Sequence, residues 1–440
     1  MKIMFISLGC DKNLSDTEEM LGILRKCGYE FTDDETEAEI IVVNTCCFIN
    51  DAKEESINTI CEMAECKKRY KCNYLIVTGC LAQRYKDEII KEIPEVDAVV
   101  GTSSYDTIAD VVKSVTEGRT VTQFMDLDRL PQITADRIVT TGGYYAYLKI
   151  AEGCDKNCTY CIIPKIRGHY RSIPMEKLVS QVEKLAERGV KELILVAQET
   201  TIYGKDIYGE KSLNLLLRKL CKIEGIYFIR ILYCYPEEIY DELIDTIKSE
   251  KKICHYLDMP IQHCNDYILR RMGRRTNKKE LMNIIYKLRE NIPDIILRTT
   301  LISGFPGETN EAHKELMEFV DEMEFDRLGV FVYSPEENTP AAGFDEQIDD
   351  EVKADRRDAI MELQQDIAFD KSESMVGKEL VAIIEGKVAD ENAYAGRTYM
   401  DAPEVDGYIF ISADDELMSG DLVRVRVTGA SEYDLIGEKI

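Results

Sequence analysis

The stretch Tyr144–Cys161 reads YYAYLKIAEGCDKNCTYC and joins a strand signal to a cysteine motif. Its first part, Tyr144–Ile150, is apolar and aromatic, which predicts a β-strand. The second part carries Cys154, Cys158 and Cys161 in a C-x3-C-x2-C spacing. Three thiols therefore follow directly on a strand, and together they offer three ligands to one inorganic centre.

The number of ligands separates the candidate metals. A closed zinc site uses four ligands, usually in two C-x2-C-like pairs. No second pair follows this motif, and the nearest histidine is His169. Three thiolates suit a four-iron cluster and leave one iron open to bind a small molecule. The spacing favours an iron–sulfur cluster, with a zinc site and ordinary core cysteines as the alternatives.

Around this motif the sequence repeats a strand followed by a helix, which predicts a central domain over about 140–372. Its six strand candidates are Tyr144–Ile150, Glu192–Ala197, Tyr227–Tyr233, Tyr256–Ile261, Ile295–Ile302 and Leu328–Tyr333. Helical patterns between them include Met175–Arg188, Glu237–Ser249 and Asn310–Met323. Such β/α units form a parallel barrel with its working site at the carboxyl ends of the strands. Because six units are fewer than eight, we expect a partial barrel.

The N-terminal segment, about 1–125, shows a similar alternation. Its short β-branched runs are Lys2–Ile6, Ile40–Val43 and Tyr74–Val77, and its helical patterns are Thr17–Lys26, Ala52–Lys67 and Gln83–Ile93. Apolar runs of this kind are typical of strands buried on both faces of a parallel sheet. The sequence thus predicts a parallel α/β sheet domain, and the polar stretch 126–134 is a plausible linker to the barrel.

A second set of three cysteines follows the strands of that sheet. Cys10, Cys46 and Cys80 each lie a few residues past the end of one predicted strand. In an open α/β sheet, ligands bind just beyond the carboxyl ends of the strands, so the three thiols can converge. They are candidates for a second cluster, whereas the alternative is that they are small buried core residues.

The C-terminal segment, about 374–440, follows a charged helical pattern over Asp350–Asp370. Its short strands, Leu380–Ile384, Gly407–Ile411 and Leu422–Val427, are separated by turns with Gly and Asp. This pattern predicts a small all-β module, most simply a small barrel. The fold class is therefore α/β, with a parallel sheet domain, a partial (β/α)6 barrel and a C-terminal β-barrel.

Composition limits the functions open to the chain. Its 440 residues carry a formal net charge of −27, from 55 Lys and Arg against 82 Asp and Glu. This balance argues against a broad nucleic-acid footprint and suits a basic protein partner, although acidity also serves solubility alone. Fifteen cysteines are an odd number, so they indicate metal ligands or catalytic thiols more than a disulfide framework.

No stretch reaches about 18 consecutive apolar residues, so no membrane-spanning helix is expected. The apolar start, Met1–Ser7, is too short for the core of a signal peptide and lacks a small-residue cleavage site. We therefore expect a cytoplasmic protein with no membrane partner.

Three further motifs end predicted barrel strands. Gln198-Glu199-Thr200-Thr201 offers a carboxylate for a ligand's ammonium group, or else starts a helix. The Gly304–Thr309 motif, GFPGET, allows a ligand to approach the backbone, or else forms a tight capped turn. His263 follows the fourth strand, and a lone histidine is more often structural.

These motifs together resemble those of the radical S-adenosylmethionine methylthiotransferases. The three strand-end cysteines stand in SLGC, VNTC and TGCLAQR, as in the N-terminal domain of that family, and the C-terminal module resembles a TRAM domain. The segments AYLKIAEGCDKNCTYCIIPKIRGHYRS, VAQETTIYG, YLDMPIQH, RTTLISGFPGET and GVFVYSPEENTPA are most similar to the branch that modifies a ribosomal protein. The resemblance covers essentially the whole chain.

The resemblance implies two [4Fe–4S] clusters and S-adenosylmethionine as cofactors. Cys154, Cys158 and Cys161 then hold the cluster whose open iron chelates S-adenosylmethionine, and Cys10, Cys46 and Cys80 hold an auxiliary cluster that carries the sulfur to be donated. Residues implied to contact S-adenosylmethionine are Tyr160, Gln198, Glu199, Ser303 and Gly304. No catalytic residue beyond the cluster ligands is implied. One departure is Cys47, beside Cys46, where relatives are expected to have a small residue.

The implied reaction adds a methylthio group to the β-carbon of an aspartate in small-subunit ribosomal protein S-twelve. A 5′-deoxyadenosyl radical removes the hydrogen, because acid–base groups cannot break an unactivated C–H bond. A second S-adenosylmethionine supplies the methyl group, and the electrons come from a donor such as flavodoxin or ferredoxin.

The alternative is the tRNA (adenosine) methylthiotransferase branch, of the MiaB type, whose TRAM module should have a basic surface. Residues 374–440 contain six basic residues against fourteen acidic ones, a net charge of −8. Such a module repels RNA and attracts a basic protein, so we expect no strong nucleic-acid binding.

Overall fold

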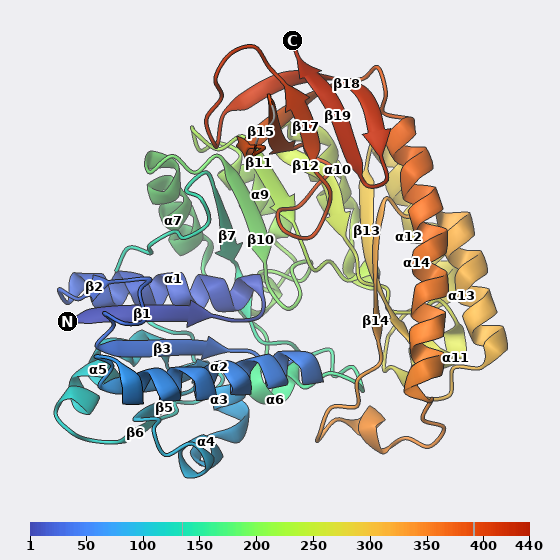
Figure 1. Cartoon of the computed structure of the whole chain (residues 1–440). Coiled ribbons are helices and arrows are strands. Elements are labelled where there is room, and N and C mark those ends of the chain that lie inside the picture. The colour runs from blue at the N-terminus through green and yellow to red at the C-terminus, as the bar shows by residue number, and fades with distance from the viewer. Residues whose placement is uncertain (134, 390–391) are drawn as a thin grey trace. The chain divides into compact units, whose positions relative to one another are not determined.

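The computed structural model describes residues 1–133, 135–389 and 392–440 (Figure 1). Thr134 of the predicted linker and the acidic residues Asp390 and Glu391 lie outside these ranges. The chain divides into two compact units. The first unit comprises Met1–Thr140, Ala151–Ile173 and Ser334–Ala342, and the second unit comprises Thr141–Ile150, Pro174–Tyr333 and Gly343–Ile440. The predicted boundaries 1–125, 140–372 and 374–440 stay predictions.

The first unit contains a parallel six-stranded sheet in the order β2-β1-β3-β4-β5-β6. Its strands are β1 (Lys2–Ser7), β2 (Glu30–Phe31), β3 (Ile40–Thr45), β4 (Tyr74–Gly79), β5 (Ala98–Val100) and β6 (Val121–Gln123). The chain goes from β1 outward to β2 and then returns to the other side of β1 at β3. This reversal creates a topological switch point between β1 and β3, where doubly wound sheets bind ligands.

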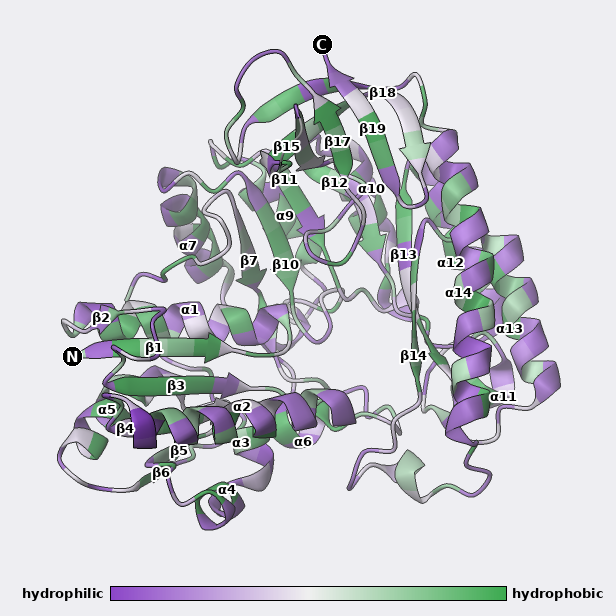
Figure 2. Ribbon diagram, viewed as in Figure 1, coloured by the Kyte–Doolittle hydropathy of each residue, from purple (hydrophilic) through white to green (hydrophobic). Residues whose placement is uncertain are grey.

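Alternating side chains of this sheet enter two separate cores. Ile41 and Val43 of β3 pack with α2 (Asn50–Arg69), α3 (Cys80–Tyr85) and α4 (Asp87–Glu92), while Ile40 and Val42 pack with α1 (Asp11–Lys26) and α5 (Ile108–Thr116). In Figure 2 most of β3 is green, the colour of hydrophobic residues. Each fully buried Val or Ile side chain contributes roughly 1.5–3 kcal/mol, so burial on both faces fixes the register of β3.

The second unit contains the partial barrel, a parallel sheet in the order β14-β13-β12-β11-β10-β7. Its strands are β7 (Tyr145–Lys149), β10 (Glu192–Val196), β11 (Phe228–Ile231), β12 (Ile253–Asp258), β13 (Ile296–Ser303) and β14 (Arg327–Val332). Its helices are α7 (Met175–Glu187), α8 (Lys205–Tyr208), α9 (Leu213–Leu220), α10 (Asp241–Ser249), α11 (Asp266–Arg271), α12 (Lys278–Asn291), α13 (Asn310–Met323) and α14 (Asp350–Glu373). Since β7 and β14 are its edge strands, the barrel stays open, as predicted.

The C-terminal strands of the second unit form a closed barrel in the order β15-β16-β17-β19-β18. They are β15 (Glu379–Lys387), β16 (Ala393–Arg397), β17 (Ile409–Ser412), β18 (Leu422–Ser431) and β19 (Asp434–Lys439). Buried charges fasten this barrel to the parallel sheet. Glu192 of β10 accepts from Arg230 of β11 at 3.1 Å and from Arg397 of β16 at 2.8 Å, and all three are fully buried.

Several elements differ from the sequence prediction. The stretch Gln83–Ile93 is helical as predicted but is divided into α3 and α4, because Lys86 between them adopts a positive φ of 44°. The first helix begins at Asp11 and not at Thr17, because Cys10 already occupies its N-cap. The prediction missed seven of the described strands, which are β2, β5, β6, β8 (Ala151–Glu152), β9 (Arg171–Ser172), β16 and β19. Within the described ranges, no helix combines the length and apolar character needed to cross a bilayer.

Candidate functional site

The strands β1, β3 and β4 are neighbours, and each leads at its carboxyl end to one cysteine of the first set. Cys10 is the N-cap of α1, Cys46 follows β3 directly, and Cys80 is the first residue of α3. Two of the three cysteines thus stand at the start of a helix. The first two lie on either side of the switch point, so the topology gathers all three at one edge of the sheet.

Two glycines allow these cysteines to approach one another closely. Gly9 has a φ of +86°, and a Cβ at this position would lie 2.8 Å from the Sγ of Cys46. Gly79 has a φ of +93°, and a Cβ there would lie 2.5 Å from the carbonyl oxygen of Thr45. Any side chain at either position would therefore push the strand-end loops apart.

The thiols of this set influence one another electrostatically. Burial, followed by the neighbouring thiols of Cys80 and Cys10, raises the pKa of Cys46 to about 12. Burial also raises the pKa of Cys80, an effect that the guanidinium of Arg167 opposes. Without metal the buried thiols of Cys46 and Cys80 are protonated at neutral pH, and a bound iron ion would displace their protons. Their mutual coupling is consistent with three ligands of one centre.

Asn13, in the first turn of α1, holds the three cysteine-bearing loops in place. Its side-chain amide donates to the carbonyl of Leu8 at 3.0 Å and to the carbonyl of Thr45 at 2.9 Å. Its Oδ1 lies 3.8 Å from the Sγ of Cys80. The side chain is fully buried and so contacts the chain beside Cys10, beside Cys46 and at Cys80. No metal-ligand motif identifies Asn13, although its spacing from Cys10 at a helix start is a signal that sequence reasoning missed.

Cys47 is fully buried and packs in the core that faces α2 and α3. Burial raises its pKa, and Cys80, Arg84 and Cys46 act on it more weakly. Cys46, in contrast, interacts with both Cys80 and Cys10 and lies against Gly9. The structure thus brings Cys46 together with both other cysteines of its set.

The second cysteine set, Cys154, Cys158 and Cys161, lies in the loop that belongs to the first unit. A short antiparallel pair of strands, β8 (Ala151–Glu152) and β9 (Arg171–Ser172), closes this loop. The amide of Cys154 donates to the carbonyl of Gly168 at 3.1 Å, and the amide of Cys161 donates to the carbonyl of Cys158 at 3.0 Å. Burial, then Cys158 and Cys154, raises the pKa of Cys161, so these three thiols also influence one another.

The loop continues into the short helix α6 (Ile163–Arg167), which anchors it to the first unit. Ile162 and Ile166 join the same core as Ile41 and Val43 of β3. The carbonyl of Ile166 also accepts a hydrogen bond from the hydroxyl of Thr102 at 2.7 Å. The loop with the second cysteine set is therefore packed on the sheet that carries the first set.

Among the described residues, no group of three or more His, Cys, Asp or Glu side chains is arranged to hold a metal ion.

The residues predicted to contact S-adenosylmethionine lie in both units. Gln198 and Glu199 follow β10, and Ser303 ends β13 next to Gly304, all in the second unit, whereas Tyr160 belongs to the first. Glu199 is fully buried and accepts a hydrogen bond from the Thr201 hydroxyl.

A buried polar network supports the Gly304 turn, and sequence reasoning missed most of it. The amide of Gly304 donates to Glu308 at 2.8 Å, and Arg356 of α14 donates to Glu308 at 3.1 Å. His263 lies nearby, with its Nε2 3.7 Å from Glu308. Its Nδ1 accepts from the amides of Cys264 and Asn265, and burial lowers its pKa to about 3. His263 is therefore neutral, in agreement with a structural role.

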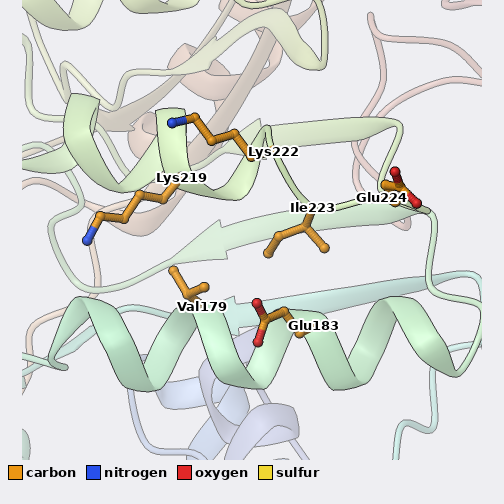
Figure 3. A pocket seen from close by; sticks show the side chains of 6 residues that line it. All are labelled: Val179, Glu183, Lys219, Lys222, Ile223 and Glu224. Carbon is orange, nitrogen blue, oxygen red and sulfur yellow. The ribbon is translucent and has the colours of Figure 1, made fainter.

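A hollow on the surface of the second unit lies apart from these residues. Its lining comes from α7, α9 and the turn after α9, and consists of Val179, Glu183, Lys219, Lys222, Ile223 and Glu224 (Figure 3). No predicted site residue lines it. The candidate site is accordingly defined by the two cysteine sets and the strand ends.

Three families match successive parts of the chain. Residues 2–101 match the family described as "Uncharacterized protein family UPF0004", residues 148–320 match the "Radical SAM superfamily", and residues 376–440 match the "TRAM domain". The first match contains Cys10, Cys46 and Cys80, and the second contains Cys154, Cys158 and Cys161.

Relatives match the full length of the chain. A protein of Lachnoclostridium phytofermentans is 65% identical over 437 residues, covering 99% of both chains. A protein of Acetivibrio thermocellus is 52% identical over 446 residues, covering 100% of this chain and 98% of the relative. Both carry the name "Ribosomal protein uS12 methylthiotransferase RimO".

A solved structure shares the fold at low sequence identity. The radical S-adenosylmethionine methyltransferase TsrM from Kitasatospora setae superposes with a TM-score of 0.55 and 13% identity, covering 77% of this chain and 76% of TsrM. At that identity the likeness concerns the fold alone.

Proposed function

We infer the function from the premise that the chain belongs to the RimO family of ribosomal protein uS12 methylthiotransferases. It is a radical S-adenosylmethionine enzyme whose substrate is that ribosomal protein. We further propose that the methylthio group is added to the β-carbon of an aspartate. The observation that carries this conclusion is the 65% identity over 99% of the chain to a relative of that name.

The cofactors are an iron–sulfur cluster and S-adenosylmethionine, in keeping with the superfamily match over residues 148–320. We propose two [4Fe–4S] clusters, one on Cys154, Cys158 and Cys161 and an auxiliary one on Cys10, Cys46 and Cys80. When bound, these groups supply a radical able to break an unactivated C–H bond, and a sulfur atom to be inserted. The burial of Cys46, Cys80, Cys154 and Cys158 and the electrostatic coupling within each set support the proposal.

The protein's own residues hold and shield these groups. Asn13 fixes the loops beside Cys10 and Cys46, and α6 fixes the loop of the second set through the apolar contacts of Ile166. Four of the six proposed ligands, Cys46, Cys80, Cys154 and Cys158, are buried, which limits the access of water and protects a reactive radical from side reactions.

We propose that S-adenosylmethionine contacts Tyr160, Gln198, Glu199, Ser303 and Gly304. The buried carboxylate of Glu199 suits an ammonium group, because burial strengthens a charge pair. Gly304 adopts a φ of +72°, and its backbone amide donates a hydrogen bond to the Glu308 carboxylate. This hydrogen bond stabilises the turn.

The proposed partners are uS12 and an electron donor such as flavodoxin or ferredoxin, with no strong nucleic-acid binding, and the proposed location is the cytoplasm. Asp414, Asp415 and Glu416 are exposed on the C-terminal barrel and add to its net charge of −8. Complementary potentials would speed the encounter with a basic protein.

The test is a product assay with two substrates. The reconstituted enzyme is incubated anaerobically with S-adenosylmethionine, a reductant and either uS12 or tRNA, and the products are analysed by mass spectrometry. We expect the mass of one methylthio group on an aspartate of uS12 and none on tRNA. A methylthio group on tRNA but not on uS12 would overturn the proposal in favour of the tRNA-modifying branch.

A further inference from the structure

Arg167, the last residue of α6, is a buried cation between the two cysteine sets. Its side chain is only 2% exposed. It donates to Asp16 at 2.8 Å and to the Oδ1 of Asn13 at 2.5 Å, and it lies 3.5 Å from Glu152. Asp16 and Asn13 belong to α1, whereas Glu152 belongs to β8, so Arg167 joins the N-terminal sheet to the loop of the second cysteine set.

Towards the first set, Arg167 acts both directly and through Asn13. Its guanidinium faces the Cys80 thiol and opposes the rise in the pKa of that thiol. The oxygen of Asn13 that accepts from Arg167 is the same oxygen that lies 3.8 Å from the Sγ of Cys80. Asn13 in turn donates to the carbonyl of Leu8, two residues before Cys10, and to that of Thr45, next to Cys46. Arg167 therefore fixes the residue on which the geometry of this set depends.

Towards the second set, Arg167 is connected through the backbone. The next residue, Gly168, accepts the hydrogen bond from the amide of Cys154 at 3.1 Å. Glu152, which faces the guanidinium, stands two residues before Cys154. A shift of either loop would thus move Arg167 relative to its partners in the other.

The charges suggest more than a packing role. Burying an arginine is expensive unless its positive charge is balanced, and here two carboxylates lie within 3.5 Å of it. If structure alone were required, an apolar side chain in this core would cost no such desolvation. A thiolate-bound cluster is a further negative group, and a cation beside it would stabilise its reduced, more negative form.

We propose that Arg167 is a positioning residue that couples the two cysteine sets, because its guanidinium orders Asn13 beside Cys80 and supplies positive charge to the cluster on Cys10, Cys46 and Cys80. This inference rests on the proposed auxiliary cluster. It adds a role for a residue that is neither a cluster ligand nor a contact of S-adenosylmethionine. Removal of the positive charge of Arg167 makes one-electron reduction of the auxiliary cluster less favourable. Removal of the negative charge of Glu152 makes this reduction more favourable.

The experiment isolates the auxiliary cluster. In a full-length background variant, Cys154, Cys158 and Cys161 are all replaced by Ala, and the chain is reconstituted anaerobically with iron and sulfide. The reduction potential of the cluster is then measured by titration with dithionite, and electron paramagnetic resonance monitors the reduced cluster at each step. A background variant that binds no iron would overturn the proposed auxiliary cluster itself, which separates that failure from a failure of the inference.

Two substitutions of opposite sign are then compared in this background. Arg167→Met is predicted to make reduction about tenfold less favourable, which is about 59 mV for one electron. Glu152→Gln is predicted to shift the equilibrium in the opposite direction, since it removes a negative charge and leaves Arg167 in place. The matched control is Arg137→Met, because Arg137 is similarly buried in the first unit but pairs with Glu18 at 2.6 Å.

The sign of the shift decides the outcome. A purely structural role predicts loss of iron without a charge-dependent change in potential. If Arg167→Met does not retain the cluster, Glu152→Gln alone decides the question. The inference is overturned if Glu152→Gln leaves the potential equal to that of the Arg137→Met control or lowers it.

Discussion

Replacing Asn13 by alanine tests how far one buried amide organises the auxiliary site. The substitution removes the donors to the carbonyls of Leu8 and Thr45, at 3.0 and 2.9 Å, and the acceptor for Arg167. Each buried polar group that loses its partner costs about 1–3 kcal/mol. Two carbonyls give about 2–6 kcal/mol, and Arg167 adds little because it keeps its bond to Asp16.

The assay has two readouts, the stability of the first unit without metal and the iron content after reconstitution. Urea unfolding is monitored by amide hydrogen exchange, which reports on β1, β3 and β4 individually. We predict that Asn13→Ala destabilises these strands by about 2–6 kcal/mol and loses the iron of the auxiliary cluster only. The control is Asn58→Ala, at an exposed position of α2 in the first unit, for which a change within about 0.5 kcal/mol is expected. Wild-type stability with a full iron content in Asn13→Ala would refute this reasoning.

Three further predictions concern individual residues. Glu192→Gln should destabilise the second unit by about 3–5 kcal/mol in urea unfolding, because Arg230 and Arg397 then share no buried carboxylate; an unchanged midpoint would contradict this. Cys46→Ala should keep reductive cleavage of S-adenosylmethionine but stop methylthiolation, whereas Cys47→Ala should keep both; the reverse pattern would make Cys47 the ligand. The folded pKa of His263, about 3, lies below its unfolded value near 6.5, so its contribution to stability is present above pH 6.5 and is lost as the pH falls towards 3. His263→Leu should remove this part of the pH dependence in urea titrations, and an unaltered slope would argue against a buried neutral histidine.

Strand signals in the sequence predicted most of the framework. The runs Ile40–Val43 and Tyr74–Val77 lie within β3 and β4, because strands buried on both faces are nearly continuous in Val and Ile. The strands that were missed include β5 and β6, which have three residues each and too short a pattern to detect. β16 and β19 contain Gly, which weakens a strand signal.

The cysteine sets were predictable, whereas their supporting residues were not. Cys10, Cys46 and Cys80 could be grouped because the carboxyl ends of neighbouring parallel strands meet at one edge. No such rule identifies Asn13 or Arg167 from the sequence, because their roles depend on a contact between residues more than 150 positions apart. The packing of Ile166 against β3, which places the second cysteine loop in the first unit, is equally nonlocal.

Iron analysis of two complementary triple variants tests the central claim, that the chain carries two separate cluster sites, most directly. We predict about eight irons per wild-type chain after anaerobic reconstitution, and about four in each variant when either Cys10, Cys46 and Cys80 or Cys154, Cys158 and Cys161 are replaced by alanine. If the variant without Cys10, Cys46 and Cys80 bound as much iron as the wild type, the auxiliary cluster would not be at this site.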